Sequence, residues 1–289
     1  MEKKICIIGA GHAFNFQYRA LQELGYNILV CDIDEEKLKG YEKTISDYRD
    51  IPDDYNLVLV STPPKTHHEI IKYLYSRGKK VISEKPLVIN LAELNDLEEN
   101  NSKFYNILHY SFGDEIEWFI NSEYRKKKPN KIKFYINDPY VKDNHIMDEK
   151  IPLNGSYLDE TINPLSAIKR IYKEDIHYLD VKKLTYAGDK YDYAAEAKFE
   201  MGSILIEAYI HWNDYGDRSK YIDIYYDDEI IRLDSINRSV INLTNKEVLY
   251  KNEEDRMYKH YLNAFRDYEI NIDNSKDAII LNREILRGA

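Results

Sequence analysis

The strongest constraint on the fold is the order of elements that the first 32 residues predict. Lys4–Ile8 is a short apolar run typical of a buried strand, and the glycine-rich segment Gly9–Phe14 (GAGHAF) follows it directly. A helical pattern comes next, and a second apolar run, Asn27–Cys31, closes at Asp32. Strand, glycine turn, helix, strand and acid together predict a βαβ unit whose turn lets the backbone approach a pyrophosphate.

The turn and the acid also indicate which dinucleotide would bind. Asp32 follows Gly11 by 21 positions (32 − 11), close to the spacing of about 20 at which an acid binds the ribose hydroxyls. A carboxylate there repels a 2′-phosphate, so NAD is favoured over NADP. Phe14 replaces the third glycine of the motif, and its bulk is expected to shift the helix or narrow the pyrophosphate site. The predicted cofactor-binding residues in this unit are Gly9, Gly11, His12, Ala13, Phe14 and Asp32. His12 either touches a phosphate or faces water, and the alternative for the whole unit is a turn that binds nothing.

The alternation of strands and helices continues through the first half of the chain. Three more strands are predicted, at Leu57–Val60, Lys80–Ser83 and Phe104–Leu108. A helix at Leu91–Leu97 has Asn90 as its N-cap. Strands separated by helices predict a mostly parallel sheet with helices on both faces, which binds ligands at the carboxyl ends of its strands. The residues at such ends are Gly9, Asp32, Ser61 and the pair Glu84–Lys85. A lysine there can reach a hydride-transfer site, so Lys85 is the first candidate catalytic residue.

The pattern changes after about residue 110. Apolar and polar residues alternate over Ile204–Trp212, and further strands are predicted at Lys131–Ile136, Tyr193–Met201, Tyr221–Tyr226 and Glu229–Leu233. These strands predict a mainly antiparallel sheet. Late helices are expected around Met257–Phe265 and Ala278–Arg287. The predicted fold class is therefore α/β, with a doubly wound Rossmann domain at residues 1–112 and an α+β domain with an open sheet at residues 113–289. The late helices are expected either there or packed back on the first domain.

The segment Gly155–Tyr172 carries a helical apolar stripe and two polar residues of interest. Asp159 and Asn163 are four positions apart, so their side chains share a helix face. Pro164 comes next, which predicts that the helix begins there or is distorted.

The chain resembles the Gfo/Idh/MocA oxidoreductases, the family of glucose–fructose oxidoreductase and inositol dehydrogenase. The resemblance rests on GAG at Gly9–Gly11, on Asp32, on TPPKTHHEI from Thr62 and on SEKPL from Ser83, and it covers about the first 110 residues. It implies that the nicotinamide ribose is lined by Thr62, Pro63 and Pro64, that Ser61, His67, Glu84 and Lys85 belong to the cofactor site, and that Asp159 matches a family acid. His67 has the alternative of packing at a helix start.

The resemblance fails at two positions of the predicted substrate site. Asn163 occupies the place of the family's histidine, and Tyr110 lies where the family often has arginine. Because an amide cannot titrate, proton transfer would fall to Lys85, assisted by Asp159. The predicted catalytic residues are thus Lys85, Asp159 and Asn163, and Tyr110 joins them as a substrate contact. For Asp159 and Asn163 the alternative is a structural role.

Composition limits the partners. The net charge is −10, which argues against nucleic acid. No run of apolar residues is long enough to cross a membrane and no signal peptide is evident, so a cytoplasmic location is expected. Cys6 and Cys31 lie in strand-like runs and are expected to be buried thiols, with no metal site. A homodimer or homotetramer is expected, because an open sheet leaves a face and edges to cover.

The leading hypothesis is an NAD-dependent oxidoreductase that acts on a secondary alcohol or ketone of a sugar, polyol or sugar derivative. Two alternatives remain open. Asn163 is compatible with an imine or tetrapyrrole reductase on the same scaffold, which can dispense with the histidine. The lost histidine and Phe14 also permit a catalytically weak regulator that senses the dinucleotide and binds another protein.

Overall fold

The computed structural model describes residues 2–100 and 102–289, and the chain forms two units. The first unit contains residues 1–108 and 257–282, and the second contains residues 109–256 and 283–289. The sequence placed a boundary at residue 112, four residues later than the structure does. In the described part of the chain, no helix is both long enough and apolar enough to cross a membrane.

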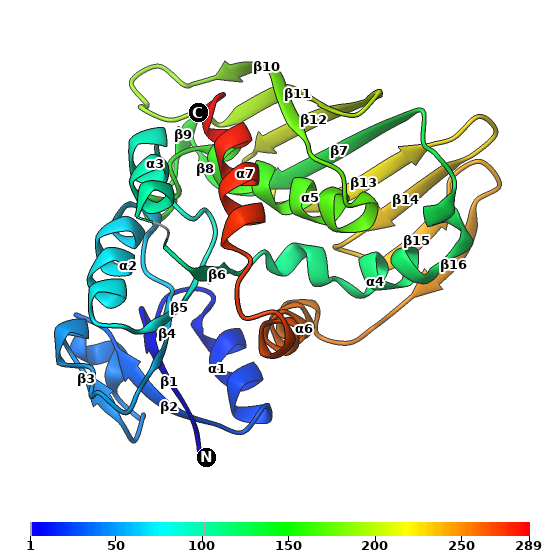
Figure 1. Ribbon diagram of the computed structural model, residues 1–289. Coiled ribbons are helices and arrows are strands. Elements are labelled where there is room, and N and C mark those ends of the chain that lie inside the picture. The colour runs from blue at the N-terminus through cyan, green and yellow to red at the C-terminus, as the bar shows by residue number, and fades with distance from the viewer. Residues whose placement is uncertain (1, 101) are drawn as a thin grey trace. The chain divides into compact units, whose positions relative to one another are not determined.

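The first unit is built on a six-stranded parallel sheet with the order β3-β2-β1-β4-β5-β6 (Figure 1). The strands are β1 Lys3–Ile8, β2 Tyr26–Cys31, β3 Thr44–Ile45, β4 Leu57–Val60, β5 Lys80–Ser83 and β6 Phe104–Asn106. The central strands are continuous apolar runs because both faces of the sheet are covered. Both cysteines are buried free thiols on neighbouring strands. The predicted last strand is too long by two residues, since β6 ends at Asn106.

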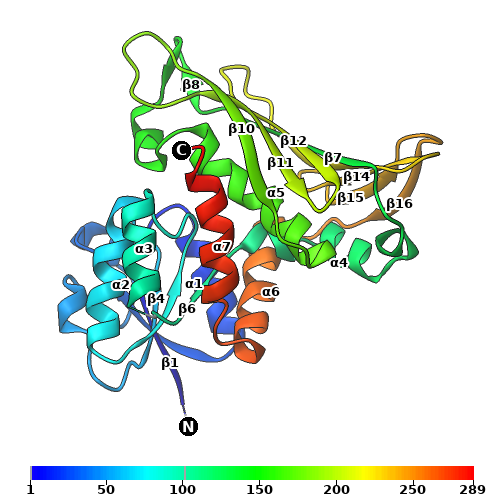
Figure 2. The same cartoon turned by 45° about the horizontal axis from the view of Figure 1, so that its top comes forward.

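Helices cover both faces of this sheet, with α2 and α3 on one side and α1 and α6 on the other (Figures 1 and 2). Their bounds are α1 Phe14–Glu23, α2 His67–Ser76, α3 Leu91–Glu99, α6 Arg256–Ile270 and α7 Ser275–Leu286. Asn90 caps α3 as predicted, with its side chain accepting a hydrogen bond from the Glu93 N–H. The segment 257–282 belongs to the first unit although it follows the whole second unit in sequence.

The second unit is built on an eight-stranded sheet with the order β10-β11-β12-β7-β13-β14-β15-β16. Its strands are β7 Lys131–Asp138, β10 His177–Leu184, β11 Ala194–Met201, β12 Ile204–Trp212, β13 Ser219–Tyr225, β14 Ile230–Asp234, β15 Ser239–Asn242 and β16 Glu247–Lys251, with a separate ribbon of β8 Val141–Lys142 and β9 His145–Ile146. The pairs are antiparallel except β7 with β12, which run parallel. A parallel pair needs a long crossover, and α5, β10 and β11 supply it. The predicted fold class is confirmed.

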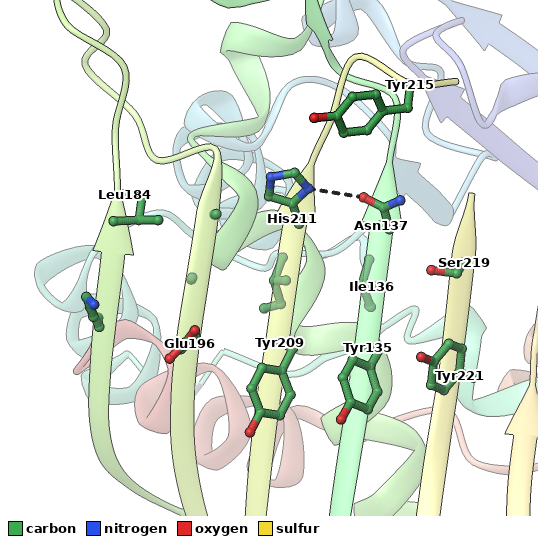
Figure 3. Close-up of a pocket in the computed structure, with 14 residues that line it drawn as sticks. Tyr135, Ile136, Asn137, Leu184, Glu196, Tyr209, His211, Tyr215, Ser219 and Tyr221 are labelled. Atoms are coloured by element: carbon green, nitrogen blue, oxygen red, sulfur yellow. Dashed lines mark hydrogen bonds between the residues drawn. The ribbon is translucent and has the colours of Figure 1, made fainter. Parts of the chain in front are cut away.

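One face of this sheet is covered and the other is open. Residues of β7 and β12 alternate between fully and partly buried, which is the two-faced pattern expected from the sequence. Helix α5 (Ser156–Tyr172) contacts β11 and β12, and the shorter α4 (Asp114–Asn121) contacts β14 to β16. Trp212 points to the covered side and is fully buried. The open side carries a row of tyrosines (Figure 3).

Helix α5 corrects the expectation that the helix begins at Pro164. It runs without interruption from Ser156 through Pro164. Asp192 fixes its true start, because its carboxylate accepts hydrogen bonds from the Ser156 hydroxyl and the Tyr157 N–H, at 2.6 and 2.8 Å. A proline removes only one N–H from the ladder, and the burial of α5 along most of its length offsets that loss.

Candidate active site

The glycine turn is closed so tightly that only glycine fits at its first position. Gly9 has φ of +99°, and a Cβ there would lie 2.5 Å from the backbone oxygen of Ser61. The Gly9 N–H donates to the Cys31 carbonyl, and the Ser61 N–H donates to the Ile8 carbonyl, both at 2.8 Å. Gly11 differs, because a Cβ there would meet no atom within 4 Å. Gly9 is therefore required by packing, whereas Gly11 leaves open space beside the backbone, as a pyrophosphate requires.

Asp32 connects the turn to the end of β2. One carboxylate oxygen accepts the Ala10 N–H at 2.7 Å and the other accepts the Asp34 N–H at 2.9 Å. The Lys37 ammonium lies 3.8 Å away. Each carboxylate oxygen can accept more than one hydrogen bond. Asp32 is thus fixed in orientation and retains acceptor capacity for ribose hydroxyls.

Phe14 does not project over the turn. It is the first residue of α1, is 3% exposed, and packs its ring against Tyr18 and Tyr41, with centroids 5.5 and 5.2 Å away. In the usual motif the third glycine allows the helix to pack closely on the strand, and here this aromatic cluster packs the start of α1 instead. His12 is exposed, and Ala13 is the N-cap of α1 without a side-chain hydrogen bond. The backbone N–H groups at the start of α1 therefore have no side-chain cap competing with a phosphate.

His67 joins the two other loops of this edge. It begins α2, is fully buried, and places Nε2 2.8 Å from the Thr62 carbonyl and Nδ1 3.0 Å from the Pro86 carbonyl. Burial lowers the pKa of His67 below 6.5, although both carbonyls act against that shift. The neutral ring has one N–H, so it donates to one carbonyl at a time. This geometry favours the packing alternative for His67: it holds the Thr62–Pro64 loop against the Lys85 loop.

We expect His67 to make stability dependent on pH. Its pKa is lower in the folded than in the unfolded chain, so the unfolded state binds more protons near and below pH 6.5. The free energy of unfolding should therefore decrease as the pH falls through about 6.5. His67→Asn should remove this part of the pH dependence and cost about 1–3 kcal/mol at pH 8, through lost packing and a lost hydrogen bond. Denaturant unfolding between pH 5 and 8 measures both effects. The exposed His12→Asn is the control, and an identical pH profile in both variants would contradict the assignment.

The loop that carries Lys85 is held by buried polar side chains. Glu84 accepts hydrogen bonds from the Gln17 amide at 2.7 Å and from the Lys85 N–H at 3.1 Å. Burial raises the pKa of Glu84, against a hydrogen bond from Tyr261 of α6 and the charge of Lys85. The Lys85–Pro86 peptide bond is cis. Lys85 itself is partly buried. Glu84 thus lies beneath the loop as its anchor, and Lys85 is the residue that the loop presents.

Two asparagines complete the support of this loop. Asn106 donates to the carbonyls of Ser83 and Glu84, at 3.0 and 3.1 Å. Asn282 accepts the Leu87 N–H at 3.2 Å. Asn106, Asn282 and the role of Gln17 were not predicted from the sequence. A signal existed for Gln17, because it is the one polar residue on the apolar face of α1.

The remaining candidates lie in the second unit, on or next to α5. Asp159 and Asn163 are both 4% exposed. The Asn163 amide nitrogen donates to Glu160 at 3.0 Å. Tyr110 is 2% exposed, and burial together with the nearby Glu115 carboxyl raises the pKa of its hydroxyl. That hydroxyl hydrogen-bonds to Ser235, so Tyr110 belongs to the interior of the second unit. No group of three or more potential metal ligands occurs among the described residues.

Comparison with known proteins relates the first part of the chain to a family. The profile of the Gfo/Idh/MocA family, described as an oxidoreductase family with an NAD-binding Rossmann fold, matches residues 3–112. The chain is 23% identical to the myo-inositol 2-dehydrogenase of Thermotoga maritima, in an alignment that covers 91% of this chain and 84% of that relative.

Two of the solved structures that share this fold match almost the whole chain. One is the UDP-N-acetylglucosamine 3-dehydrogenase of Acidithiobacillus ferrooxidans, with a TM-score of 0.79, 14% identity and coverage of 99% of this chain and 96% of that one. The other is an oxidoreductase from Agrobacterium radiobacter in complex with NAD+, L-tartaric acid and magnesium, with a TM-score of 0.79, 15% identity and coverage of 100% and 95%.

The fold and the glycine turn with its acid define the class as an NAD-binding Rossmann oxidoreductase. Residues 3–112 match the Gfo/Idh/MocA profile, which confirms the resemblance inferred from the sequence and supports NAD as the cofactor.

Proposed function

We propose that the protein transfers hydride between NAD(H) and a secondary alcohol or ketone of a polyol, sugar or sugar derivative. The observation that best supports this proposal is the position of four residues at the carboxyl ends of four neighbouring parallel strands: Gly9, Asp32, Ser61 and Lys85. Ligands bind at such strand ends in open α/β sheets. The names of the relatives, which are dehydrogenases of an inositol and of a nucleotide sugar, support a carbohydrate-derived substrate.

The residues of the first unit fit NAD. The Gly11 position leaves room for a pyrophosphate, α1 presents its N-terminus, and the Asp32 carboxylate has capacity for the ribose hydroxyls while repelling a 2′-phosphate. The Ser61–Pro64 loop and the Lys85 loop lie at the same edge and are joined by His67. When bound, NAD supplies the hydride acceptor or donor.

The protein must supply the proton transfer. Oxidising a secondary alcohol to a ketone removes a hydride from carbon and a proton from the hydroxyl oxygen, so a group must accept that proton. Asn163 cannot titrate. We therefore assign the proton to the Lys85 amine, assisted by Asp159, and assign to Asn163 the orientation of the substrate. In the reverse direction the Lys85 ammonium returns the proton to the carbonyl oxygen.

A substrate screen tests this proposal. Purified protein is expected to shift NADH fluorescence and to reduce NAD with at least one member of a panel of inositols, aldoses and nucleotide sugars. Turnover of cyclic imines in place of polyols would favour the imine-reductase alternative. Tight NAD binding without turnover of any compound, together with capture of one specific protein partner, would favour the regulator.

Asp32 should set both the affinity for NAD and the choice against NADP. Asp32→Ala is expected to weaken NAD binding by about 10- to 100-fold, because hydrogen bonds to a charged group contribute about 1.5–3 kcal/mol. The ratio of NADP to NAD affinity should rise in the same variant, since the repulsion of the 2′-phosphate is gone. Isothermal titration with both dinucleotides measures the two constants. The exposed neighbour Asp34→Ala serves as the control, and equal losses in both variants would refute the assignment.

The open face of the second-unit sheet fits a second copy of this chain, as a homodimer or homotetramer requires. The rings of Tyr135 and Tyr209 are stacked, with centroids 4.9 Å apart, and the ring centroid of Tyr221 lies 5.0 Å from that of Tyr135 (Figure 3). Charges beside these tyrosines are paired, Lys133 with Glu207 at 3.0 Å and Arg232 with Asp223 at 2.7 Å. An aromatic surface with compensated charge is typical of the core of a protein interface.

Disruption of this face should lower the molecular mass in solution. Tyr209→Lys places an unpaired ammonium among the tyrosines, and a desolvated lone charge is costly at an interface. Light scattering after size-exclusion chromatography is expected to show a smaller assembly for Tyr209→Lys than for the control Tyr75→Lys, whose tyrosine lies on α2 and is 39% exposed. A wild-type protein that is already monomeric would refute this use of the sheet.

A further inference from the structure

Helix α5 carries a buried carboxyl group, Glu160, that none of the roles above uses. Glu160 is 2% exposed, and Asn163 lies one helical turn further along. Side chains three positions apart on a helix are neighbours, and the Asn163 amide nitrogen lies 3.0 Å from Glu160 Oε2 in a buried hydrogen bond. Buried carboxylates are rare unless they are paired, so Glu160 is expected to have charged partners.

Glu160 belongs to a buried ionic cluster formed with two strands. Lys220 of β13 places its ammonium 3.1 Å from each Glu160 oxygen and 2.6 Å from Asp138 Oδ2, at the end of β7. Burial acts against the Lys220 ammonium, but Glu160 and Asp138 outweigh it and raise its pKa. Arg218 approaches Asp138 from the surface, at 3.7 Å. The cluster therefore fixes Glu160 from the strand side, with both of its oxygens beside the Lys220 ammonium.

This arrangement determines which way the Asn163 amide faces. Glu160 Oε2 already accepts a hydrogen bond from the Lys220 ammonium, and an oxygen acting as acceptor faces the NH₂ group of the amide and not the carbonyl. The carbonyl oxygen then points away from Glu160. Asn163 Oδ1 is buried and has no hydrogen-bond partner among the described residues. An unsatisfied buried acceptor is uncommon in folded proteins and needs an explanation.

We propose that Glu160 is a positioning residue that orients Asn163, so that the Asn163 carbonyl accepts a hydrogen bond from a substrate hydroxyl. This inference rests on the function proposed above and deepens it. An acceptor in a fixed orientation selects a substrate that presents a hydroxyl as donor, and it rejects an analogue in which that hydroxyl is replaced by hydrogen. The substrate class is therefore a polyol with a hydroxyl that meets Asn163, next to or at the reacting carbon.

The orientation is tested without any substrate. The side-chain NH₂ signals of Asn163 are assigned in a ¹⁵N spectrum by their loss in Asn163→Ala. Glu160→Gln removes the charged acceptor with little change in volume, and it is expected to shift these signals. Glu200→Gln, at an exposed position on β11, is the matched control and should leave them in place. Unchanged Asn163 signals in Glu160→Gln would overturn the proposal.

The consequence for specificity is tested with myo-inositol and its monodeoxy analogues, or with whichever polyol of the panel is turned over and its deoxy analogues. Wild type is expected to prefer the full polyol over one analogue by about 10- to 100-fold in kcat/KM, because that analogue leaves a buried acceptor unpaired. Asn163→Ala should abolish this preference. Glu160→Gln should reduce it at least several-fold while thermal melting shows a folded protein.

The outcomes separate this inference from the proposed function. Shifted Asn163 signals with no turnover of any polyol would refute the proposed function and with it the substrate contact. Turnover with a preference that survives in Asn163→Ala would refute the inference alone, and that result is decisive even if Glu160→Gln does not fold.

Discussion

Lys85→Ala is expected to reduce kcat by about 10²–10⁴-fold, the range that a positioned acid or base contributes. Lys85 is a titratable residue in a loop whose backbone is held by Glu84, Asn106 and Asn282. Their hydrogen bonds go to backbone groups of the loop, so the loop and most of the NADH affinity should persist. Steady-state kinetics with the best substrate of the panel and NADH fluorescence titration measure the two quantities.

The comparison variant for Lys85→Ala is Lys276→Ala. Lys276 is an exposed lysine at the start of α7 in the same unit, so its removal changes the net charge equally. It should retain wild-type kcat. Full activity of Lys85→Ala on an identified substrate would show that the proton is handled elsewhere, and an equal loss of NADH affinity would show that Lys85 serves the cofactor more than the reaction.

The two glycines of the turn are expected to respond in opposite ways. Gly9→Ala forces a Cβ to within 2.5 Å of the Ser61 oxygen at a φ of +99°, so overpacking and backbone strain should cost about 2–4 kcal/mol of stability. Gly11→Ala adds a methyl group to open space and should change stability by less than about 0.5 kcal/mol. Denaturant unfolding measures both.

Cofactor binding supplies the second half of this comparison. Gly11→Val should remain folded but bind NAD much more weakly, since its side chain fills the space where the pyrophosphate approaches the backbone. If Gly11→Val binds NAD as wild type does, the dinucleotide follows another path across the sheet. If Gly9→Ala is as stable as wild type, the turn is less tightly packed than the contact with Ser61 indicates.

Local sequence patterns predicted most of the secondary structure of the first unit. Its buried strands are continuous apolar runs that end at a glycine, an aspartate or a serine, so strand bounds and strand ends follow from the sequence directly. The same holds for β12, whose alternation matches a sheet with one covered face. The parallel pairing of β7 with β12 was not predictable in this way, because alternation specifies a face and not the direction of the neighbouring strand.

The supports of the site were harder to predict for a different reason. Asn106 and Asn282 are about 176 positions apart and meet only through the fold. Glu160 gave no signal, because one acid among several polar residues in a helix looks solvent-exposed until the burial of α5 is known. The expectation that the helix begins at Pro164 was wrong. It compared the loss of one N–H hydrogen bond with the stability of an isolated helix, whereas α5 is packed along most of its length.

The return of the chain to the first unit has a practical consequence for anyone dividing this protein. Tyr261 and Asn282 reach the Lys85 loop from a segment encoded more than 140 residues after the Rossmann strands end. A shortened gene ending at residue 112 would therefore express the strands and turns of the sheet without the two side chains that brace the Lys85 loop. Such a fragment would also lack α6 and expose the face of the sheet that α6 covers, so studies of dinucleotide binding need the whole chain.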